Sequence, residues 1–325
     1  MTAPLPVGVV GVGALGRHHA RHLAQMPEAR LVGVYDVDQE RARAIANEYG
    51  CRAFADLDAL LAEVEAVSVV VPTASHVAVG LRALGAGVPV LMEKPLAATL
   101  EEADQLVAAA AARGLQLQVG HIERFNRAVR AAAPYLEEPR FVEGHRLAPF
   151  QPRGTDVAVV LDLMIHDLDL ILHLTGGAEL VDVRASGAQV LSSHLDIVNA
   201  RVEFDNGTVA SVTASRVARE RRRLLRIFQE TGYLRLDLAQ GTGEFLRVRK
   251  GWAPGEGSQL EDALERIVLE APEVDALRAE LESFVHAVRG GRETVVTGAE
   301  GRAALALALA VSAAVGRNPV ALRAR

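Results

Sequence analysis

The chain of 325 residues has little cysteine, few aromatic side chains and no excess of positive charge. Its single cysteine, Cys51, excludes an intramolecular disulfide framework and a cysteine-based zinc cluster within one chain, and favours a reducing compartment. Aromatic residues make up 4% of the chain and the formal net charge is -6, whereas nucleic-acid binding usually leaves a basic signature across a domain. These scarcities argue against a nucleic-acid partner.

The sequence also lacks a long hydrophobic run. Its most apolar stretch, 303–315, is shorter than the roughly 20 residues that span a bilayer and is rich in alanine, so we expect a core helix and no membrane partner. The N-terminal residues show no basic region followed by a signal-like apolar run. We therefore expect a cytoplasmic protein.

The first part of the chain alternates strand-like runs with helical segments, which is typical of a parallel, doubly wound α/β sheet. Strand-like runs occur at 7–12, 31–37, 66–72, 88–93 and 115–120. Helical segments separate them, among them 41–49, 76–84 and 100–112. This pattern predicts a Rossmann domain at residues 1–120.

The rhythm changes after Gly120. Successive strand-like segments at 181–190, 196–204 and 209–217 follow, with Asp205-Asn206-Gly207 as a hairpin turn, and predict a largely antiparallel sheet. An apolar helical segment at 157–174 precedes them, and the tail from Gly298 is helical again. We predict a second, α+β domain at 121–325, with the helix 298–315 packed at the domain interface.

A glycine-rich loop directly follows the first strand and opens a helix, which is the context that a GxGxxG motif requires. The loop consists of Gly11, Gly13, Ala14, Leu15 and Gly16. The first glycine permits a tight turn, the second lets the backbone approach a pyrophosphate, and the third lets helix and strand pack closely. Asp36 lies twenty residues after Gly16, where a carboxylate accepts hydrogen bonds from the adenine ribose. The motif predicts NAD as the cofactor. Because Arg41 is nearby in the sequence, NADP is an alternative cofactor. A second alternative is that the glycines form an ordinary turn that binds no dinucleotide.

Glu93-Lys94-Pro95 lies at the carboxyl end of a predicted parallel strand, the edge at which open α/β sheets bind ligands. The alternative is a surface lysine in a loop. We also expect cofactor contacts at this edge of the sheet. The residues expected to make them are Pro72, Thr73, His76, Glu93 and Lys94.

A polar stripe runs along the otherwise apolar segment 157–174. Asp162, His166, Asp169 and His173 recur there at helical spacing, so they predict a face that meets a cavity or charged partners. A solvated face of an amphipathic helix is the alternative. Asp162, His166 and Asp169 have a spacing at which they can converge on a metal, but no further ligand cluster accompanies them, so we predict no metal.

Taken together, these features resemble the Gfo/Idh/MocA family of oxidoreductases over essentially the whole chain. The motifs that carry the resemblance are the glycine loop, Glu93-Lys94-Pro95, Gly120-His121 with Arg124-Phe125, the set Asp162, His166 and Asp169, and a closing helix with Ser312 and Gly316-Arg317. Asn126-Arg127 departs from the pattern, because a proline is frequent there. The segments 120–126, 159–172 and 215–217 are most similar to members that oxidise the 3-hydroxyl of UDP-N-acetylglucosamine.

The resemblance implies an open-faced sheet in the second domain, a homo-dimer or tetramer, and a partner aminotransferase that converts the ketone to an amine. It also implies that Lys94, Asp162 and His166 are catalytic. In our hypothesis His166 is the general base, Asp162 orients its imidazole and Lys94 stabilises the developing oxyanion. The roles of Lys94 and His166 are open to exchange at this point.

A UDP-sugar substrate needs groups that bind its diphosphate. Arg216 and the run Arg219, Arg221, Arg222, Arg223 are candidates, with Arg219, Arg221 and Arg223 on one face if the run is a strand. A solvated basic edge that discourages aggregation is the alternative. The expected substrate-binding residues are His121, Arg124, Asp169, Arg216 and Arg223.

Two other functions are compatible with the same residues. One is a dehydrogenase of the family that acts on inositol, a free sugar or a linear tetrapyrrole. The other is a non-catalytic NAD-binding regulator, against which the presence of Lys94, Asp162 and His166 together argues.

Overall fold

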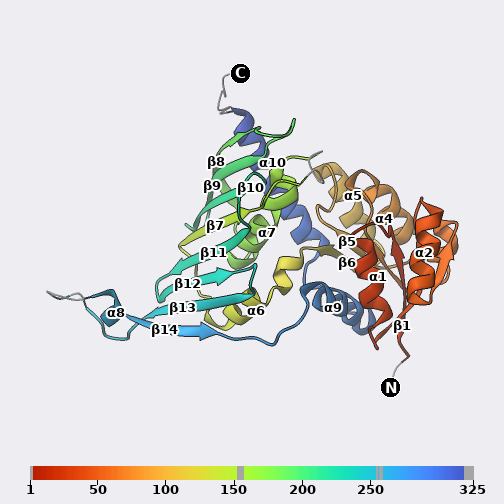
Figure 1. Cartoon of the computed structure of the whole chain (residues 1–325), viewed down its shortest axis with the longest axis horizontal. Coiled ribbons are helices and arrows are strands. Elements are labelled where there is room, and N and C mark those ends of the chain that lie inside the picture. Colours follow the sequence, from red (N-terminus) through yellow and green to blue (C-terminus); the bar gives the residue numbers. More distant parts are fainter. Residues whose placement is uncertain (1–2, 152–156, 254, 256–258, 318–325) are drawn as a thin grey trace. The chain divides into compact units, whose positions relative to one another are not determined.

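The chain divides into two units by the contacts between its residues. The structure, a computed structural model, describes residues 3–151, 157–253, 255 and 259–317 (Figure 1). One unit contains the residues up to Ile122 together with Val274–Leu305, and the other contains Glu123–Glu273 and the residues from Ala306 onward. The segment 274–305, expected in the second domain from its place in the sequence, thus lies with the first unit.

The first unit is built on a six-stranded parallel sheet in the order β3-β2-β1-β4-β5-β6. Its strands are β1 (Leu5–Val10), β2 (Ala29–Tyr35), β3 (Arg52–Phe54), β4 (Ala66–Val69), β5 (Val90–Glu93) and β6 (Leu117–Gly120). The central strands β1 and β4 are almost wholly buried and apolar, as expected when helices cover both faces of a sheet. The prediction of a doubly wound parallel sheet is confirmed.

Helices accompany this sheet. They are α1 (Gly16–Ala24), α2 (Gln39–Tyr49), α3 (Leu57–Leu61), η1 (Thr73–Ser75), α4 (His76–Gly85), α5 (Leu100–Ala111) and, from a distant part of the chain, α9 (Ala276–Gly290). Side-chain caps fix several helix starts: Asp38 accepts hydrogen bonds from the first turn of α2, and Thr99 forms a capping box with Glu102 at α5.

Helix α9 contributes to the core of the first unit. Leu281 and Phe284 of α9 are fully buried and belong to one cluster with Val7 and Val9 of β1 and Leu23 of α1. Phe284→Ala is expected to cost about 3–5 kcal/mol, because the ring loses its burial and leaves a cavity. The first unit therefore needs a segment that follows the second sheet in sequence.

The second unit contains an eight-stranded sheet in the order β14-β13-β12-β11-β7-β10-β9-β8 (Figure 1). Its strands are β7 (Phe141–Leu147), β8 (Leu180–Ala188), β9 (Ile197–Phe204), β10 (Val209–Ser215), β11 (Arg222–Gln229), β12 (Gly232–Asp237), β13 (Thr242–Val248) and β14 (Leu264–Leu269). β7 pairs with β10 in parallel, and the other neighbouring pairs are antiparallel. The expected largely antiparallel sheet is confirmed.

Short helices accompany this sheet. They are η2 (Ile122–Phe125), α6 (Arg127–Ala132), η3 (Ala133–Tyr135), the π-helical turn η4 (Val160–Met164), α7 (Ile165–Leu174) and α8 (Leu260–Ala263). The final helix is α10 (Gly298–Arg317). In the described part of the chain, its stretch Gly298–Gly316 is long and apolar enough to cross a bilayer by length and composition, and about half of it is buried.

Candidate functional site

The glycine loop lies between β1 and α1 and has the shape of a cradle. Gly11 has a φ of 84°, and a Cβ there would lie 2.4 Å from the carbonyl oxygen of Val70. A Cβ on Gly16 would lie 1.9 Å from the carbonyl oxygen of Gly11, so only glycine fits. A Cβ on Gly13 would meet nothing within 4 Å. The backbone at Gly13 is therefore open to a close ligand, as a bound dinucleotide requires.

Asp36 holds the cradle from the end of β2. Its Oδ2 accepts a hydrogen bond from the amide of Val12 at 2.8 Å, and its Oδ1 accepts one from the amide of Asp38 at 2.9 Å. Arg41 Nη1 lies 3.4 Å from both oxygens, and its Nη2 lies 3.0 Å from Asp38. Each carboxylate oxygen has two acceptor positions, and the long contact with Arg41 uses one on each, so ribose hydroxyl groups would replace Arg41 at Asp36.

The segments after β4 and β5 meet at His76, which is 1% exposed. Its Nε2 lies 3.0 Å from the carbonyl oxygen of Val71, and its Nδ1 lies 3.0 Å from that of Pro95 and 3.3 Å from that of Leu96. Burial lowers the pKa of His76, although these hydrogen bonds act in the opposite direction. His76 thus ties together the two segments that carry Pro72, Thr73 and Lys94.

Lys94 follows β5 directly, at the carboxyl edge of the first sheet. Its amide lies 3.2 Å from Oε2 of the Glu93 side chain, and His121 follows the neighbouring strand β6 with a buried ring. The structure therefore brings Glu93, Lys94 and His121 to the same edge as the glycine loop. In an open parallel sheet this edge is where ligands bind.

The residues of the expected polar stripe have different surroundings in the structure. Asp162 lies in the π-helical turn η4, a feature frequent at functional sites, and His166 lies in the first turn of α7; both are partly buried. Asp169 is buried and forms a bidentate ion pair with Arg124, at 2.7 and 2.8 Å. His173 is exposed. Because a buried charge needs a partner, the pairing gives Arg124 and Asp169 a structural role, and their contact with substrate stays a prediction.

A cavity of about 180 Å³ in the second unit is lined by several of the candidate residues. Asp162 lines it together with Arg216, Arg221 and Arg223. Arg219 is not part of the lining, because β11 begins only at Arg222 and the run does not form one strand face as expected. Burial lowers the pKa of Arg223, and the nearby charge of Arg146 lowers it further, so its guanidinium lacks full compensation for its charge.

A buried ionic cluster, which shares Arg146 and Arg223 with the cavity lining, was not predicted from the sequence. Arg146 forms a bidentate pair with Asp167 at 2.7 and 3.0 Å and donates to Glu123 at 2.8 Å, and Arg223 Nη1 lies 3.4 Å from the same Glu123 oxygen. Burial raises the pKa of Asp167 despite Arg146. The sequence signal that could have indicated this cluster is Arg146, an arginine at an inward position of the alternating strand β7. The strand β7 itself was not predicted.

Contacts with Val157 and Asp196 hold Arg216 in place. Its Nη2 donates to the carbonyl oxygen of Val157 at 2.6 Å, and its Nε lies 3.8 Å from Asp196. The hydroxyl of Ser192 and the amides of residues 190–192 donate to Asp196 and lower its pKa to about 2, although burial acts in the opposite direction. Arg216 therefore joins the cavity wall to the segment before η4.

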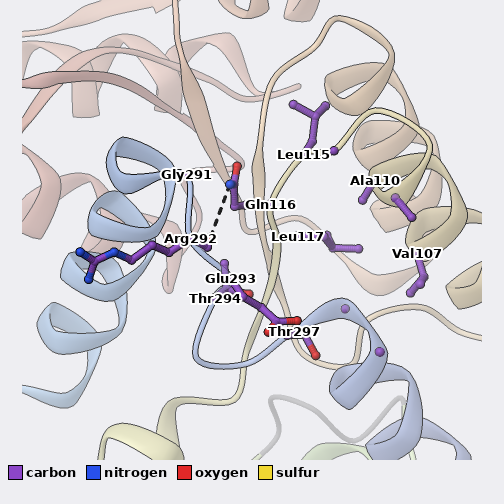
Figure 2. Close-up of a pocket in the computed structure, with 14 residues that line it drawn as sticks. Val107, Ala110, Leu115, Gln116, Leu117, Gly291, Arg292, Glu293, Thr294 and Thr297 are labelled. Atoms are coloured by element: carbon purple, nitrogen blue, oxygen red, sulfur yellow. Dashed lines mark hydrogen bonds between the residues drawn. The ribbon is translucent and has the colours of Figure 1, made fainter.

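Two further cavities formed by described residues are lined by none of the expected site residues. The cavity in Figure 2, of about 310 Å³, lies between the end of α5, the start of β6 and the segment 291–299. It lies at the amino end of β6, whereas the candidate residues lie at the carboxyl ends of the strands. Among the described residues, no group of three or more His, Cys, Asp or Glu is arranged to hold a metal ion.

Two protein-family models match the chain. Residues 5–121 match the model described as "Oxidoreductase family, NAD-binding Rossmann fold", and residues 131–235 match the "GFO/IDH/MocA C-terminal domain". The two matches correspond to the sheet with the glycine cradle and to the first part of the second unit.

Characterised relatives and solved structures resemble the chain over different lengths. The UDP-N-acetylglucosamine 3-dehydrogenase of Acidithiobacillus ferrooxidans is 45% identical over 95% of this chain and 96% of its own. A solved structure of that enzyme has a TM-score of 0.90, with 97% of this chain and 99% of that chain covered at 43% identity. The inositol 2-dehydrogenase of Rubrobacter xylanophilus is 38% identical over 51% of this chain and 50% of its own. GenD2 from gentamicin A biosynthesis, solved with NAD, has a TM-score of 0.81 at 25% identity, covering 97% and 95%.

Proposed function

The chain belongs to the Gfo/Idh/MocA family of oxidoreductases, and from this we propose that it oxidises the 3-hydroxyl of UDP-N-acetylglucosamine to a ketone with NAD. The relative of that name, similar over nearly the whole length of both chains, supports this substrate. The observation that carries the proposal is the cavity in which Asp162 and four arginines, Arg146 among them, share one lining. A nucleotide sugar needs both anion-binding groups and catalytic groups, whereas an unphosphorylated polyol gives the arginines no role.

We propose NAD rather than NADP as the cofactor. The carboxylate of Asp36 would meet a 2'-phosphate with a like charge, and the guanidinium of Arg41 is already shared between Asp36 and Asp38. The open backbone at Gly13 fits the pyrophosphate of NAD, and the carboxylate of Asp36 fits its ribose once the long contact with Arg41 is displaced. Gly11, Gly13, Ala14, Leu15, Gly16, Pro72 and Thr73 are the proposed cofactor contacts, with His76 and Glu93 positioning the adjacent segments.

The reaction removes a proton from the hydroxyl and a hydride from its carbon. His166 accepts the proton as general base, Asp162 orients the imidazole, and the ammonium of Lys94 stabilises the oxygen as negative charge develops on it. When bound, NAD would supply the hydride acceptor. The net change is alcohol and NAD⁺ to ketone, NADH and a proton.

The diphosphate of the substrate is proposed to bind Arg223 and Arg221. Arg223 is held only loosely by Glu123, at 3.4 Å, and its lowered pKa indicates a site that favours an added anion. Arg216 shapes the same wall through Val157. The dimer or tetramer, the aminotransferase partner and the cytoplasmic location stay predictions.

A substrate screen tests this function. NADH formation is followed by absorbance with UDP-N-acetylglucosamine, UDP-glucose, free N-acetylglucosamine and myo-inositol, with hydroxylamine present to capture a ketone. Turnover with UDP-N-acetylglucosamine, inhibited competitively by UDP, is the expected result. Oxidation of an unphosphorylated polyol without competition by UDP would sink the nucleotide-sugar proposal and leave the family assignment intact.

A further inference from the structure

A buried histidine outside every residue set assigned above lies next to the catalytic edge of the first unit. His19 belongs to α1 and is 0% exposed. Its Nδ1 lies 2.8 Å from the hydroxyl oxygen of Ser68 in β4, and its Nε2 lies 3.2 Å from Oε1 of Glu93 at the end of β5. The second contact is too poorly aligned for a strong hydrogen bond, so its effect is mainly that of charge and dipole. His19 therefore joins three elements of the sheet layer.

The carboxylate of Glu93 is fixed on several sides. Oε1 faces His19, and Oε2 faces the amide of Lys94 at 3.2 Å. A Cβ on Gly120 of the neighbouring strand β6 would lie 3.1 Å from Oε1, so the glycine leaves room for this carboxylate. The Glu93 side chain is only 13% exposed. A mostly buried carboxylate of this kind needs partners that favour its ionised form.

We propose that His19 is a positioning residue, which acts through Glu93 to keep a fixed negative charge beside the ammonium of Lys94. His19 itself touches neither substrate nor reacting atoms in this scheme. Burial favours the neutral form of Glu93, but the contact with His19 and the charges of His19 and Lys94 together lower its pKa. This inference rests on the proposed function, because that function gives Lys94 its catalytic role.

The charged and titratable groups around Glu93 come from three elements. They are His19 of α1, His76 of α4, whose ring is influenced by the Glu93 charge, and Lys94 after β5. An ionised Glu93 stabilises the protonated form of Lys94. Loss of this charge is therefore expected to let Lys94 lose its proton at lower pH, by about one pH unit.

The sequence makes a direct measurement practical, because Lys94 and Lys250 are its only lysines. Protein labelled with ¹³C at lysine Cε gives two lysine signals, assigned with Lys250→Arg. Each signal is followed by NMR as pH rises, in the full chain without substrate. In Glu93→Gln, the titration midpoint of Lys94 is expected to fall by about one pH unit, while exposed Lys250 stays constant as an internal control.

Variants of His19 test whether it acts through Glu93. His19→Leu removes the contact that fixes the Glu93 carboxylate, so that its charge is no longer held beside Lys94, and the Lys94 midpoint is expected to fall. His19→Gln, which keeps an N–H donor, should lower it less. The double variant with Glu93→Gln should match Glu93→Gln alone, because two residues in one chain of contacts are not additive. His18→Asn, an exposed neighbour in the same helix, serves as the matched control and should leave the midpoint unchanged.

Two results would overturn the inference: an unchanged Lys94 midpoint in Glu93→Gln, or an unchanged midpoint in His19→Leu. If His19→Leu does not fold by circular dichroism, His19→Gln takes its place in the comparison, with equality to the unmodified protein as the contradicting result. The titration requires no turnover. A failed titration therefore rejects the role of His19, whereas a failed substrate screen rejects the proposed function.

Discussion

Gly13→Ala is expected to separate cofactor binding from folding. The added methyl group meets no protein atom within 4 Å, and the φ of Gly13 is not in the left-handed region. Alanine at such a position restricts the unfolded chain and stabilises a protein by about 0.4–1 kcal/mol. The same methyl group points into the open space where the backbone must approach a pyrophosphate. Stability is thus expected to rise slightly while NAD affinity falls at least about tenfold, or about 1.4 kcal/mol.

Two glycine variants serve as controls. Gly85→Ala, at the end of α4, also meets nothing within 4 Å, so it should change stability to a similar extent without changing NAD affinity. Gly16→Ala places a methyl group 1.9 Å from a backbone oxygen and should destabilise the protein by at least roughly 1–3 kcal/mol.

The assay measures both quantities on each variant: NAD affinity by isothermal titration calorimetry and the free energy of unfolding by urea titration. If Gly13→Ala bound NAD as tightly as the unmodified protein, the glycine cradle would not be the pyrophosphate site.

Five other substitutions test the remaining assignments. Asp36→Ala should narrow the preference for NAD over NADP in binding titrations, and equal binding of both cofactors by the unmodified protein would contradict the assignment. Lys94→Ala and His166→Ala should each lower kcat by about a hundredfold or more with NAD affinity nearly unchanged, because both act in the transition state; full turnover in either variant removes that residue from the mechanism. Arg223→Ala should raise KM for the UDP-sugar far more than it lowers kcat, an effect that shrinks in high salt. Asp196→Asn should destabilise the protein at neutral pH, with the difference vanishing as pH falls from about 4 towards 2: the folded pKa of about 2 lies below the unfolded value, so the stabilisation by Asp196 is present above that range.

The first sheet was largely predictable because its signals are local. Its strands β1, β2, β4, β5 and β6 are continuous apolar runs bounded by helices and turns, and the glycine loop stands directly between a strand and a helix. The three-residue strand β3 was missed because it is too short to show a pattern. That α9 packs into this unit depends on contacts with residues more than 250 positions away along the chain, which periodicity does not show.

Three of the eight strands of the second sheet were predicted: β8, β9 and β10. β9 and β10 alternate between buried and more exposed positions and flank the Asp205-Asn206-Gly207 turn, whereas β7 and β11, which were not predicted, carry charged residues at several positions. Arg146 is the clearest case, since its inward position is stable only with Glu123 and Asp167 from other elements. Such pairing is a tertiary property, so it overrides the local preference of arginine for the surface.

The candidate site was likewise predictable only in part. Spacing alone related Asp162 to His166, but the π-helical turn at Asp162 and the pairing of Asp169 with Arg124 divide the expected stripe into residues with different surroundings. The arginine run predicted a basic patch, and the start of β11 at Arg222 determines that Arg221 and Arg223 line the cavity. The contact of His19 with Glu93 has no signal in the sequence, because 74 positions separate two residues that only the sheet order brings together.

Isotope transfer tests the central claim most directly. UDP-N-acetylglucosamine carrying deuterium at C3 is incubated with the protein and NAD, with hydroxylamine to capture the ketone, and the NADH formed is analysed by mass spectrometry. The account predicts NADH that carries one deuterium, because the hydride leaves C3 of the sugar. Unlabelled NADH, or a sugar product that keeps its deuterium at C3, would contradict it.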